Sequence, residues 1–319
     1  MKKKTAPTKA GRTLQGRDFI SIDDCSTKEI MSLLRLGAAI KAHPKKYRRA
    51  LDGKMMALIF EKPSLRTRTT FTVGMSQLGG DSILLTPADI SLGKRESVYD
   101  VAKNLERMVH GIMIRTFAHA TCTSMALNAR IPVINGLTDH EHPCQAMADF
   151  MTILEYRKDL RALKLAYVGD GNNVAHSLML IAAKLGATLA LGTPGAYRPD
   201  PAVSARAEAI ARLEGGALSW SEDPASAVRG ADVVYTDTWA SMGQEGEAQA
   251  RRAVFAPYRV DRALFSLAKK DALFMHCLPA HRGEEVTDDV IDSPNSVVFT
   301  QAENRLHVQK AIMVELLGG

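Results

Sequence analysis

Short apolar runs alternate along the first half of the chain with segments whose apolar residues recur every three or four positions. The runs have the length of buried strands, whereas the intervening segments have the period of amphipathic helices. Strands are predicted over residues 54–60, 81–85, 111–114 and 132–135, and helices over residues 26–42, 64–78, 98–108 and 121–129. This alternation is typical of a parallel sheet covered by helices.

A longer amphipathic pattern over residues 142–156 predicts a helix that bridges two domains, because a second alternation follows it. Strands are predicted there over residues 164–168, 188–191, 233–236, 272–275 and 297–300, and helices over residues 173–185, 202–213 and 304–317. The prediction is an α/β protein with two doubly wound parallel-sheet domains joined by interdomain helices. The two domains are placed at residues 17–145 and 146–303.

The composition is that of an ordinary globular protein, with 46% hydrophobic and 24% charged residues among 319. A formal net charge of +6 suggests a nucleic-acid partner, but much of the excess lies in the opening MKKKTAPTKAGR. Residues 1–16 are therefore predicted to be a flexible basic tail. The sequence contains neither an apolar signal segment nor a run of the roughly 18 apolar residues that span a bilayer, which favours a cytoplasmic protein with no nucleic-acid or membrane partner.

Four cysteines are scattered along the chain, at Cys25, Cys122, Cys144 and Cys277. They form no CxxC pair, so neither a zinc site nor a redox motif is indicated. We expect free thiols.

The stretch FEKPSLRTRTTFT, from Phe60 to Thr72, lies between a predicted strand and a predicted helix. Pro63 interrupts the backbone and Ser64 is a favoured N-cap, so Arg66 and Thr67 fall in the first turn of the helix. A helix N-terminus offers free N–H groups and a partial positive charge, and arginine adds paired donors that suit phosphate oxygens. The stretch predicts a phosphate site, although arginines in a polar turn are often merely solvated.

Other polar residues follow predicted strands or begin a helix, as ligand-binding residues do in parallel sheets. Arg115 ends the strand of residues 111–114, and HPCQ places His142 and Gln145 in the first turn of the bridging helix. Each of these signals is weak alone, because a histidine at a helix start is more often a cap or a surface group.

The loop GDGNN after residues 164–168 is not a dinucleotide loop, because no third glycine closes the G-x-G-x-x-G pattern. Asn172 and Asn173 instead offer amide donors and acceptors. DTWASMGQE follows another strand and begins with Asp237, and HCLP follows a third and contains Cys277. A cysteine there is usually inert, and no activating His or Asp pair predicts a covalent thioester.

Together these motifs, in this order and with the arginine of QAENR, resemble the aspartate/ornithine carbamoyltransferase family over nearly the whole chain from about residue 17. SMG and HCLP resemble the ornithine-type members. The resemblance implies that the helix within residues 304–319 completes the first domain, which binds carbamoyl phosphate, and that the second domain binds ornithine. It implies no metal and no organic cofactor.

The resemblance also assigns roles to individual residues. The residues implied to bind carbamoyl phosphate are Ser64, Leu65, Arg66, Thr67, Ser91, Arg115, His142, Gln145, Cys277, Leu278 and Arg305. Among them, the residues implied to be catalytic are Arg115, His142, Cys277 and Arg305. The residues implied to bind ornithine are Asn173, Asp237, Ser241 and Met242.

Two positions depart from the ornithine-type pattern. Ser91, in DISLGKRES, stands where a glutamine commonly reaches into the neighbouring subunit's site, and Thr72 replaces a common glutamate. The family implies a homotrimer, or a multiple of trimers, with sites at subunit boundaries.

The reaction implied is the transfer of a carbamoyl group from carbamoyl phosphate to L-ornithine, giving L-citrulline and phosphate, in arginine synthesis or breakdown. One alternative is another acceptor amine, such as putrescine, lysine or an acylated ornithine. A regulatory homologue without catalysis is a second alternative, and Arg66, Arg115, His142 and Arg305 argue against it.

Overall fold

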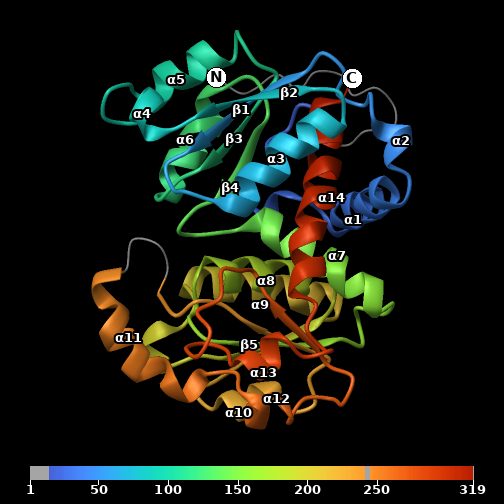
Figure 1. The fold of residues 1–319 in the computed structure, drawn as a ribbon, viewed down its shortest axis with the longest axis vertical. Helices are drawn as coiled ribbons and strands as arrows, with labels where there is room; N and C mark the ends of the chain where they lie inside the picture. Colours follow the sequence, from blue (N-terminus) through green and yellow to red (C-terminus); the bar gives the residue numbers. More distant parts are fainter. Residues whose placement is uncertain (1–13, 241–244, 319) are drawn as a thin grey trace. The chain divides into compact units, whose positions relative to one another are not determined.

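The computed structural model describes residues 14–240 and 245–318, and these form two compact units (Figure 1). Unit 1 comprises the chain up to Met151 together with the segment from Asn304, and unit 2 comprises Thr152–Glu303. Most of the predicted basic tail, residues 1–13, lies outside the described residues. Among the helices of the described ranges, none combines the length and apolar character needed to cross a bilayer.

Unit 1 contains a four-stranded parallel sheet in the order β2-β1-β3-β4. Its strands are β1 (Met55–Phe60), β2 (Asp81–Leu85), β3 (Gly111–Arg115) and β4 (Val133–Leu137). Its helices are α1 (Thr27–Ala42), α2 (Pro44–Tyr47), α3 (Leu65–Gln77), α4 (Pro87–Ile90), α5 (Val98–Leu105), α6 (His119–Asn128) and most of α7 (Pro143–Tyr156). The fully buried Ile112, Ile114 and Val133 belong to its core, as expected for strands covered on both faces.

The last helix, α14 (Val298–Leu317), packs against α3 within unit 1 (Figure 1). Gly74 permits the close approach, since a Cβ there would lie 2.8 Å from Met313 Cε and 3.3 Å from Lys310 Cγ. The N-terminal end of α3 is the predicted phosphate site, and α14 carries Arg305. The packing therefore brings a residue near the end of the sequence to that site.

Unit 2 contains a five-stranded parallel sheet in the order β7-β6-β5-β8-β9. Its strands are β5 (Lys164–Val168), β6 (Thr188–Gly192), β7 (Ala217–Ser221), β8 (Val233–Thr236) and β9 (Leu273–His276). Its helices are α8 (Asn173–Lys184), α9 (Pro201–Glu214), α10 (Pro224–Val228), α11 (Ala248–Phe255), α12 (Arg262–Phe265) and α13 (Asp288–Ile291). The predicted α/β class with two parallel sheets is confirmed.

The prediction of a strand over residues 297–300 is wrong. Within the part of the chain that the structure describes, this segment forms one parallel bridge, between Ser296 and Phe274, where Val297 N donates to Phe274 O at 3.0 Å. From Val298 the chain is helical, and Phe299 is 72% exposed. A run of β-branched and aromatic residues favours a strand locally, but tertiary packing overrides such a weak preference.

Each sheet has a point at which the strand order reverses, because the chain continues from two neighbouring strands toward opposite edges of the sheet. The two strands are β1 and β3 in unit 1, and β5 and β8 in unit 2. Ligands of open parallel sheets bind at the carboxyl ends of the strands at such points. Arg115 ends β3, and Asp237 directly follows β8. Each unit therefore presents predicted site residues where its own topology favours a ligand.

Candidate functional site

The start of α3 has the geometry of an anion site. Ser64 is the N-cap, and its hydroxyl accepts a hydrogen bond of 3.1 Å from Thr67 N. Arg66 lies in the same first turn and is partly buried, whereas Leu65 is 76% exposed. The thirteen residues of α3 place the positive end of a helix dipole beside these side chains.

Thr67 joins residues from three distant parts of the sequence. Its fully buried hydroxyl accepts hydrogen bonds from Arg115 Nη1 at 3.3 Å and from Arg305 Nη2 at 2.7 Å. Both arginines are almost fully buried. A hydroxyl carries no charge, so this contact concentrates positive charge at the start of α3 without neutralising it.

His142 lies in this positive environment and is buried at the start of α7. Burial, followed by the charges of Arg305, Arg115 and Arg66, holds its pKa well below the usual 6.5. The imidazole is therefore neutral at pH 7 and suited to donate a hydrogen bond to a ligand oxygen without transferring its proton.

Gln145, one turn further along α7, is buried with 1% exposure. Its Nε2 donates to Asp149 Oδ1 at 2.8 Å, which fixes the orientation of the amide. Its Oε1 is also buried, without a hydrogen-bond partner among the described residues. That oxygen is suited to accept a hydrogen bond from an N–H group of a ligand.

Ser91 makes its contact elsewhere. It ends α4 in the left-handed region, at φ 41°, and its hydroxyl donates to Pro87 O at 2.8 Å within the same loop. Ser91 therefore does not join the Thr67 group through any hydrogen bond within the described residues of this chain.

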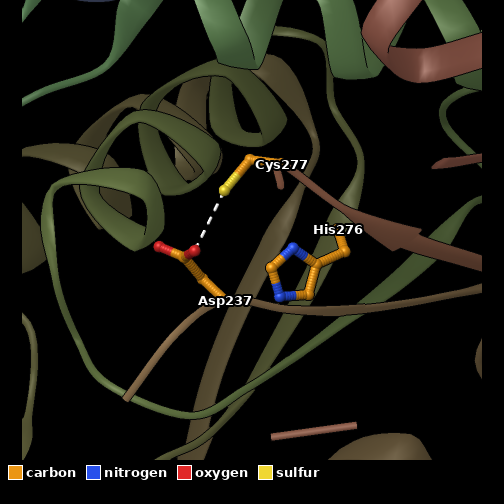
Figure 2. A group of neighbouring side chains, drawn as sticks. All are labelled: Asp237, His276 and Cys277. Carbon is orange, nitrogen blue, oxygen red and sulfur yellow. Dashed lines mark hydrogen bonds between the residues drawn. The ribbon is translucent and has the colours of Figure 1, made fainter. Parts of the chain in front are cut away.

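In unit 2, Asp237 is the centre of a second polar group. Its Oδ1 accepts a hydrogen bond of 3.0 Å from Cys277 Sγ, and its Oδ2 accepts one of 2.9 Å from Asn172 Nδ2. Figure 2 shows the Asp237 carboxylate facing the Cys277 sulfur, with the His276 ring beside them. Both hydrogen-bonding partners are uncharged donors, so neither of them gives the buried carboxylate a positive partner, and the group is suited to a cationic ligand.

Asp237, His276 and Cys277 have the residue types of a metal site, with potential ligand atoms within 4.8 Å of one another. Both nitrogens of His276, however, have other partners. Its Nδ1 accepts from Leu278 N at 2.9 Å, which leaves Nε2 to donate to Glu285 Oε1 at 3.2 Å. Binding a metal ion through His276 would break one of these buried hydrogen bonds. The arrangement therefore favours an ammonium group over a metal ion as the ligand of Asp237.

The HCLP turn is shaped by these contacts, because Leu278 adopts φ 57° while its N–H is bound to His276. Asn173, predicted to bind ornithine, is the first residue of α8, and Asn172 caps this helix by accepting from Val174 N and Ala175 N. Ser241 and Met242, the other predicted ornithine ligands, lie outside the described residues.

Two residues that sequence reasoning missed are Asp170, within GDGNN, and Arg251 of α11. Arg251 Nη1 donates to Asp170 Oδ2 at 2.9 Å, and both residues are buried. The sequence does carry a signal for Asp170, since it is an acidic residue two positions after the end of a buried strand. Its partner lies 81 residues away in the sequence, where nothing distinguishes Arg251 from Arg252.

Family models cover almost the whole chain. The aspartate/ornithine carbamoyltransferase carbamoyl-P binding domain matches residues 17–155, and the Asp/Orn binding domain of the same family matches residues 161–316. The two matches meet between residues 155 and 161, near the boundary of the units at Met151 and Thr152, while residues 304–316 of the second match belong to unit 1.

Individual relatives are similar over nearly their full length. The ornithine carbamoyltransferase of Thermococcus kodakarensis is 53% identical over 309 residues, which are 96% of this chain and 98% of the relative. The solved ornithine carbamoyltransferase from Pyrococcus furiosus has a TM-score of 0.93 and 51% identity, covering 96% of this chain and 98% of that one. An acetylornithine transcarbamylase solved with acetylcitrulline has a TM-score of 0.85 at 34% identity, covering 95% of this chain and 100% of that one.

Proposed function

The chain belongs to the aspartate/ornithine carbamoyltransferase family, and we propose that it transfers the carbamoyl group of carbamoyl phosphate to the side-chain amine of L-ornithine, forming L-citrulline and phosphate. The observation that carries the proposal is the convergence of Arg115 and Arg305 on the Thr67 hydroxyl at the start of α3. Such a group of fixed donors matches a ligand that carries a phosphate beside a carbonyl.

The chemical steps assign tasks to the unit 1 residues. The amine nitrogen attacks the carbamoyl carbon, negative charge gathers on the carbamoyl oxygen, and the bond to the phosphate oxygen then breaks. Donors from Thr67, Arg115, His142 and Arg305 stabilise the developing oxyanion, because they are held in place before the charge appears. The departing phosphate is received by Ser64, Arg66 and the free N–H groups of α3, among them that of Leu65.

The carbamoyl nitrogen needs acceptors rather than donors. Gln145 Oε1 is the acceptor that unit 1 offers, since its amide is oriented by Asp149. The Leu278 carbonyl is the second acceptor in the proposed scheme. The N–H of Leu278 donates a hydrogen bond to His276 Nδ1, and this bond restrains the position of the Leu278 carbonyl.

In unit 2 the proposed partner of Asp237 is the α-ammonium group of ornithine, and the proposed partner of Asn173 is its carboxylate. Cys277, bonded to Asp237, lies against the aliphatic part of the substrate, and Ser241 and Met242 complete the head-group contacts. A buried carboxylate repels a second carboxylate, so aspartate, which carries one in its side chain, is a poor acceptor here.

The attacking amine must be uncharged, although an alkyl ammonium has a reference pKa of about 10.4. We propose that the enzyme binds or generates the neutral form and that the departing phosphate takes up the proton. This scheme requires no metal and no organic cofactor. We also propose that the enzyme acts in the cytoplasm as a homotrimer.

Formation of citrulline by the purified protein tests the proposal. With carbamoyl phosphate as donor, ornithine should exceed aspartate, putrescine, lysine and N-acetylornithine by at least about a hundredfold in kcat/KM, because a lost buried charge pair costs several kcal/mol. Equal turnover of putrescine would exclude the head-group roles of Asp237 and Asn173. Preference for N-acetylornithine would identify an acylated acceptor, and a lack of turnover with every amine would indicate a chain without catalysis.

A further inference from the structure

Arg251 and Asp170 form a buried ion pair to which the proposed chemistry gives no task. Arg251 Nη1 lies 2.9 Å from Asp170 Oδ2, and the two side chains are only 7% and 10% exposed. The same Nη1 donates to the carbonyl oxygen of Trp239 at 2.8 Å. One nitrogen of Arg251 therefore holds both the loop that follows β5 and the loop that follows β8.

The same two loops are joined at a second point. Asn172 lies two residues beyond Asp170, and its Nδ2 donates to Asp237 Oδ2, while Trp239 lies two residues beyond Asp237. The contacts form a closed ring that runs from Arg251 through Asp170 and Asn172 to Asp237 and back through Trp239. Moving Arg251 would change the spacing between Asn172 and Asp237.

The guanidinium of Arg251 has little freedom to move. Its Nε donates to Glu247 Oε2 at 3.3 Å, and its central carbon lies 4.7 Å from the centre of the Tyr197 ring. The Trp239 ring stacks on Phe255, with ring centres 6.0 Å apart and an angle of 18° between the planes. Contacts of this kind fix a rotamer and make Arg251 a rigid support.

We propose that Arg251 is a positioning residue for recognition of the amino-acid head group, holding the Asp237 loop against the Asn172 loop at the spacing that the α-ammonium and α-carboxylate require. The inference rests on the proposed function and adds to it the origin of selectivity for an amino acid over a simple diamine. Arg251 acts through Asp170 and Trp239 and does not touch the substrate.

A dependence on pH follows from the same contacts. Burial raises the pKa of Asp170 to about 6, the charge and hydrogen bond of Arg251 oppose this rise, and the carboxylates of Asp237 and Glu247 add to it. The Tyr167 hydroxyl contacts the same residue and donates a hydrogen bond of 2.8 Å to the backbone carbonyl oxygen of Asp170. Below about pH 6, Asp170 becomes neutral and Arg251 keeps only the exposed Glu247 as a charged partner, so head-group affinity should fall.

The test compares Arg251→Met and Asp170→Asn with wild type, each saturated with carbamoyl phosphate. Arg252→Met is the matched control, because the neighbouring Arg252 is 58% exposed and pairs with Glu284 on the surface. The probe is L-norvaline, which has the head group of ornithine but no side-chain amine, titrated calorimetrically from pH 5.5 to 7.5. The kcat and KM for ornithine and putrescine, and the Kd for carbamoyl phosphate alone, are measured in parallel.

Arg251→Met should weaken norvaline binding and raise the ornithine KM by about tenfold to a hundredfold, since small displacements in a site have effects of that size. The preference for ornithine over putrescine should shrink by a similar factor, while carbamoyl phosphate affinity stays within about twofold. Asp170→Asn should weaken norvaline at neutral pH and abolish the loss of affinity near pH 6. Arg252→Met should match wild type in every measurement.

Norvaline affinity within about twofold of wild type in folded Arg251→Met overturns the inference, as does a fall in kcat without a change in norvaline affinity. If Arg251→Met does not fold, Asp170→Asn decides by the same criteria, because asparagine keeps the shape of aspartate. A wild-type protein that neither binds norvaline nor uses ornithine refutes the proposed function instead, so the two failures are distinct.

Discussion

Arg305 donates a 2.7 Å hydrogen bond from Nη2 to the hydroxyl of Thr67, although 238 residues separate them. The contact exists because α14 packs on α3, with Gly74 admitting the side chains of Lys310 and Met313. Arg115 reaches the same hydroxyl from the end of β3. Thr67 therefore orients two arginines that the proposed mechanism places on the carbamoyl group.

Replacing Thr67 with valine should weaken carbamoyl phosphate binding by about tenfold to a hundredfold, because a hydrogen bond to a charged group contributes about 1.5–3 kcal/mol. Valine keeps the shape of the buried side chain, so the protein should remain folded. Thr70→Val is the control, since its hydroxyl donates to the Arg66 carbonyl at 2.7 Å. Calorimetric titration of carbamoyl phosphate into both variants checks the prediction, and equal affinities would contradict it.

The sequence predicts the local geometry at the start of α3 because the residues concerned follow one another, from Ser64 through Arg66 to Thr67, and the capping rules place them on one helical turn. Arg115 and His142 are found as residues at the end of a strand and the start of a helix. Local patterns of this kind carry their own structural information, since each depends on neighbours within a few positions.

Contacts between distant segments are what the sequence does not predict. No pattern pairs Arg251 with Asp170, because each is one of many charged residues and only the folded chain brings them together. Strand β7 was missed because Ala217–Ser221 is at the sheet edge and partly exposed, so it lacks a continuous apolar run. The segment from Val297 has such a run, yet only Ser296 forms a bridge to β9.

The neutral state of His142 should make the stability of unit 1 depend on pH. Its pKa is held well below 6.5 in the folded protein, so below about pH 6.5 the unfolded chain binds a proton that the folded protein does not. The free energy of unfolding should therefore fall as pH decreases through this range, by up to about 1.4 kcal/mol per pH unit for this one proton.

Chemical denaturation between pH 5 and 7.5 gives the free energy of unfolding of wild type and of His142→Gln. The contribution of His142 is the difference between their two pH dependences. The variant should show a shallower slope, because glutamine does not titrate, and other acidic groups contribute equally to both proteins. Parallel slopes would mean that His142 is not held neutral by its surroundings.

Cys277 should be the cysteine that reacts first with iodoacetamide. None of the four cysteines, all within the described residues, forms a disulfide bond. Cys25, Cys122 and Cys144 are buried, whereas Cys277 is partly exposed. Burial also raises the pKa of Cys144 to about 12, which suppresses the reactive thiolate. Peptide mapping should show alkylation at Cys277 in step with loss of activity.

L-Norvaline together with carbamoyl phosphate should slow that alkylation, because the proposed head-group site lies beside Asp237 and Cys277. Cys277→Ser is the control, since a hydroxyl can still donate to Asp237 and does not alkylate. Inactivation of this variant at the wild-type rate would show that the reagent acts at another residue.

The loop after α4 is expected to take part in the proposed trimer. Ser91 bonds within its own loop, while Lys94 is exposed and the 64%-exposed Arg95 lies 3.9 Å from Glu96, at the limit of an ion pair. We propose that this loop completes the phosphate site of a neighbouring subunit, where long cations gain an anionic partner. The alternative is that both cations are solvated.

Subunit mixing separates these readings. Arg66→Ala should inactivate the phosphate site at the start of α3, and the Ser91/Lys94/Arg95 triple-alanine variant should inactivate the loop. Each trimer alone should therefore be nearly inactive. When the two variants are denatured together and reassembled at random, an intact start of α3 meets an intact neighbouring loop at about a quarter of the subunit boundaries. The mixture should therefore regain about a quarter of the wild-type activity. Mass spectrometry of differently tagged subunits confirms that hybrids form. A fully active triple-alanine variant, or hybrids that stay inactive, would show that each subunit builds its phosphate site without this loop of its neighbour.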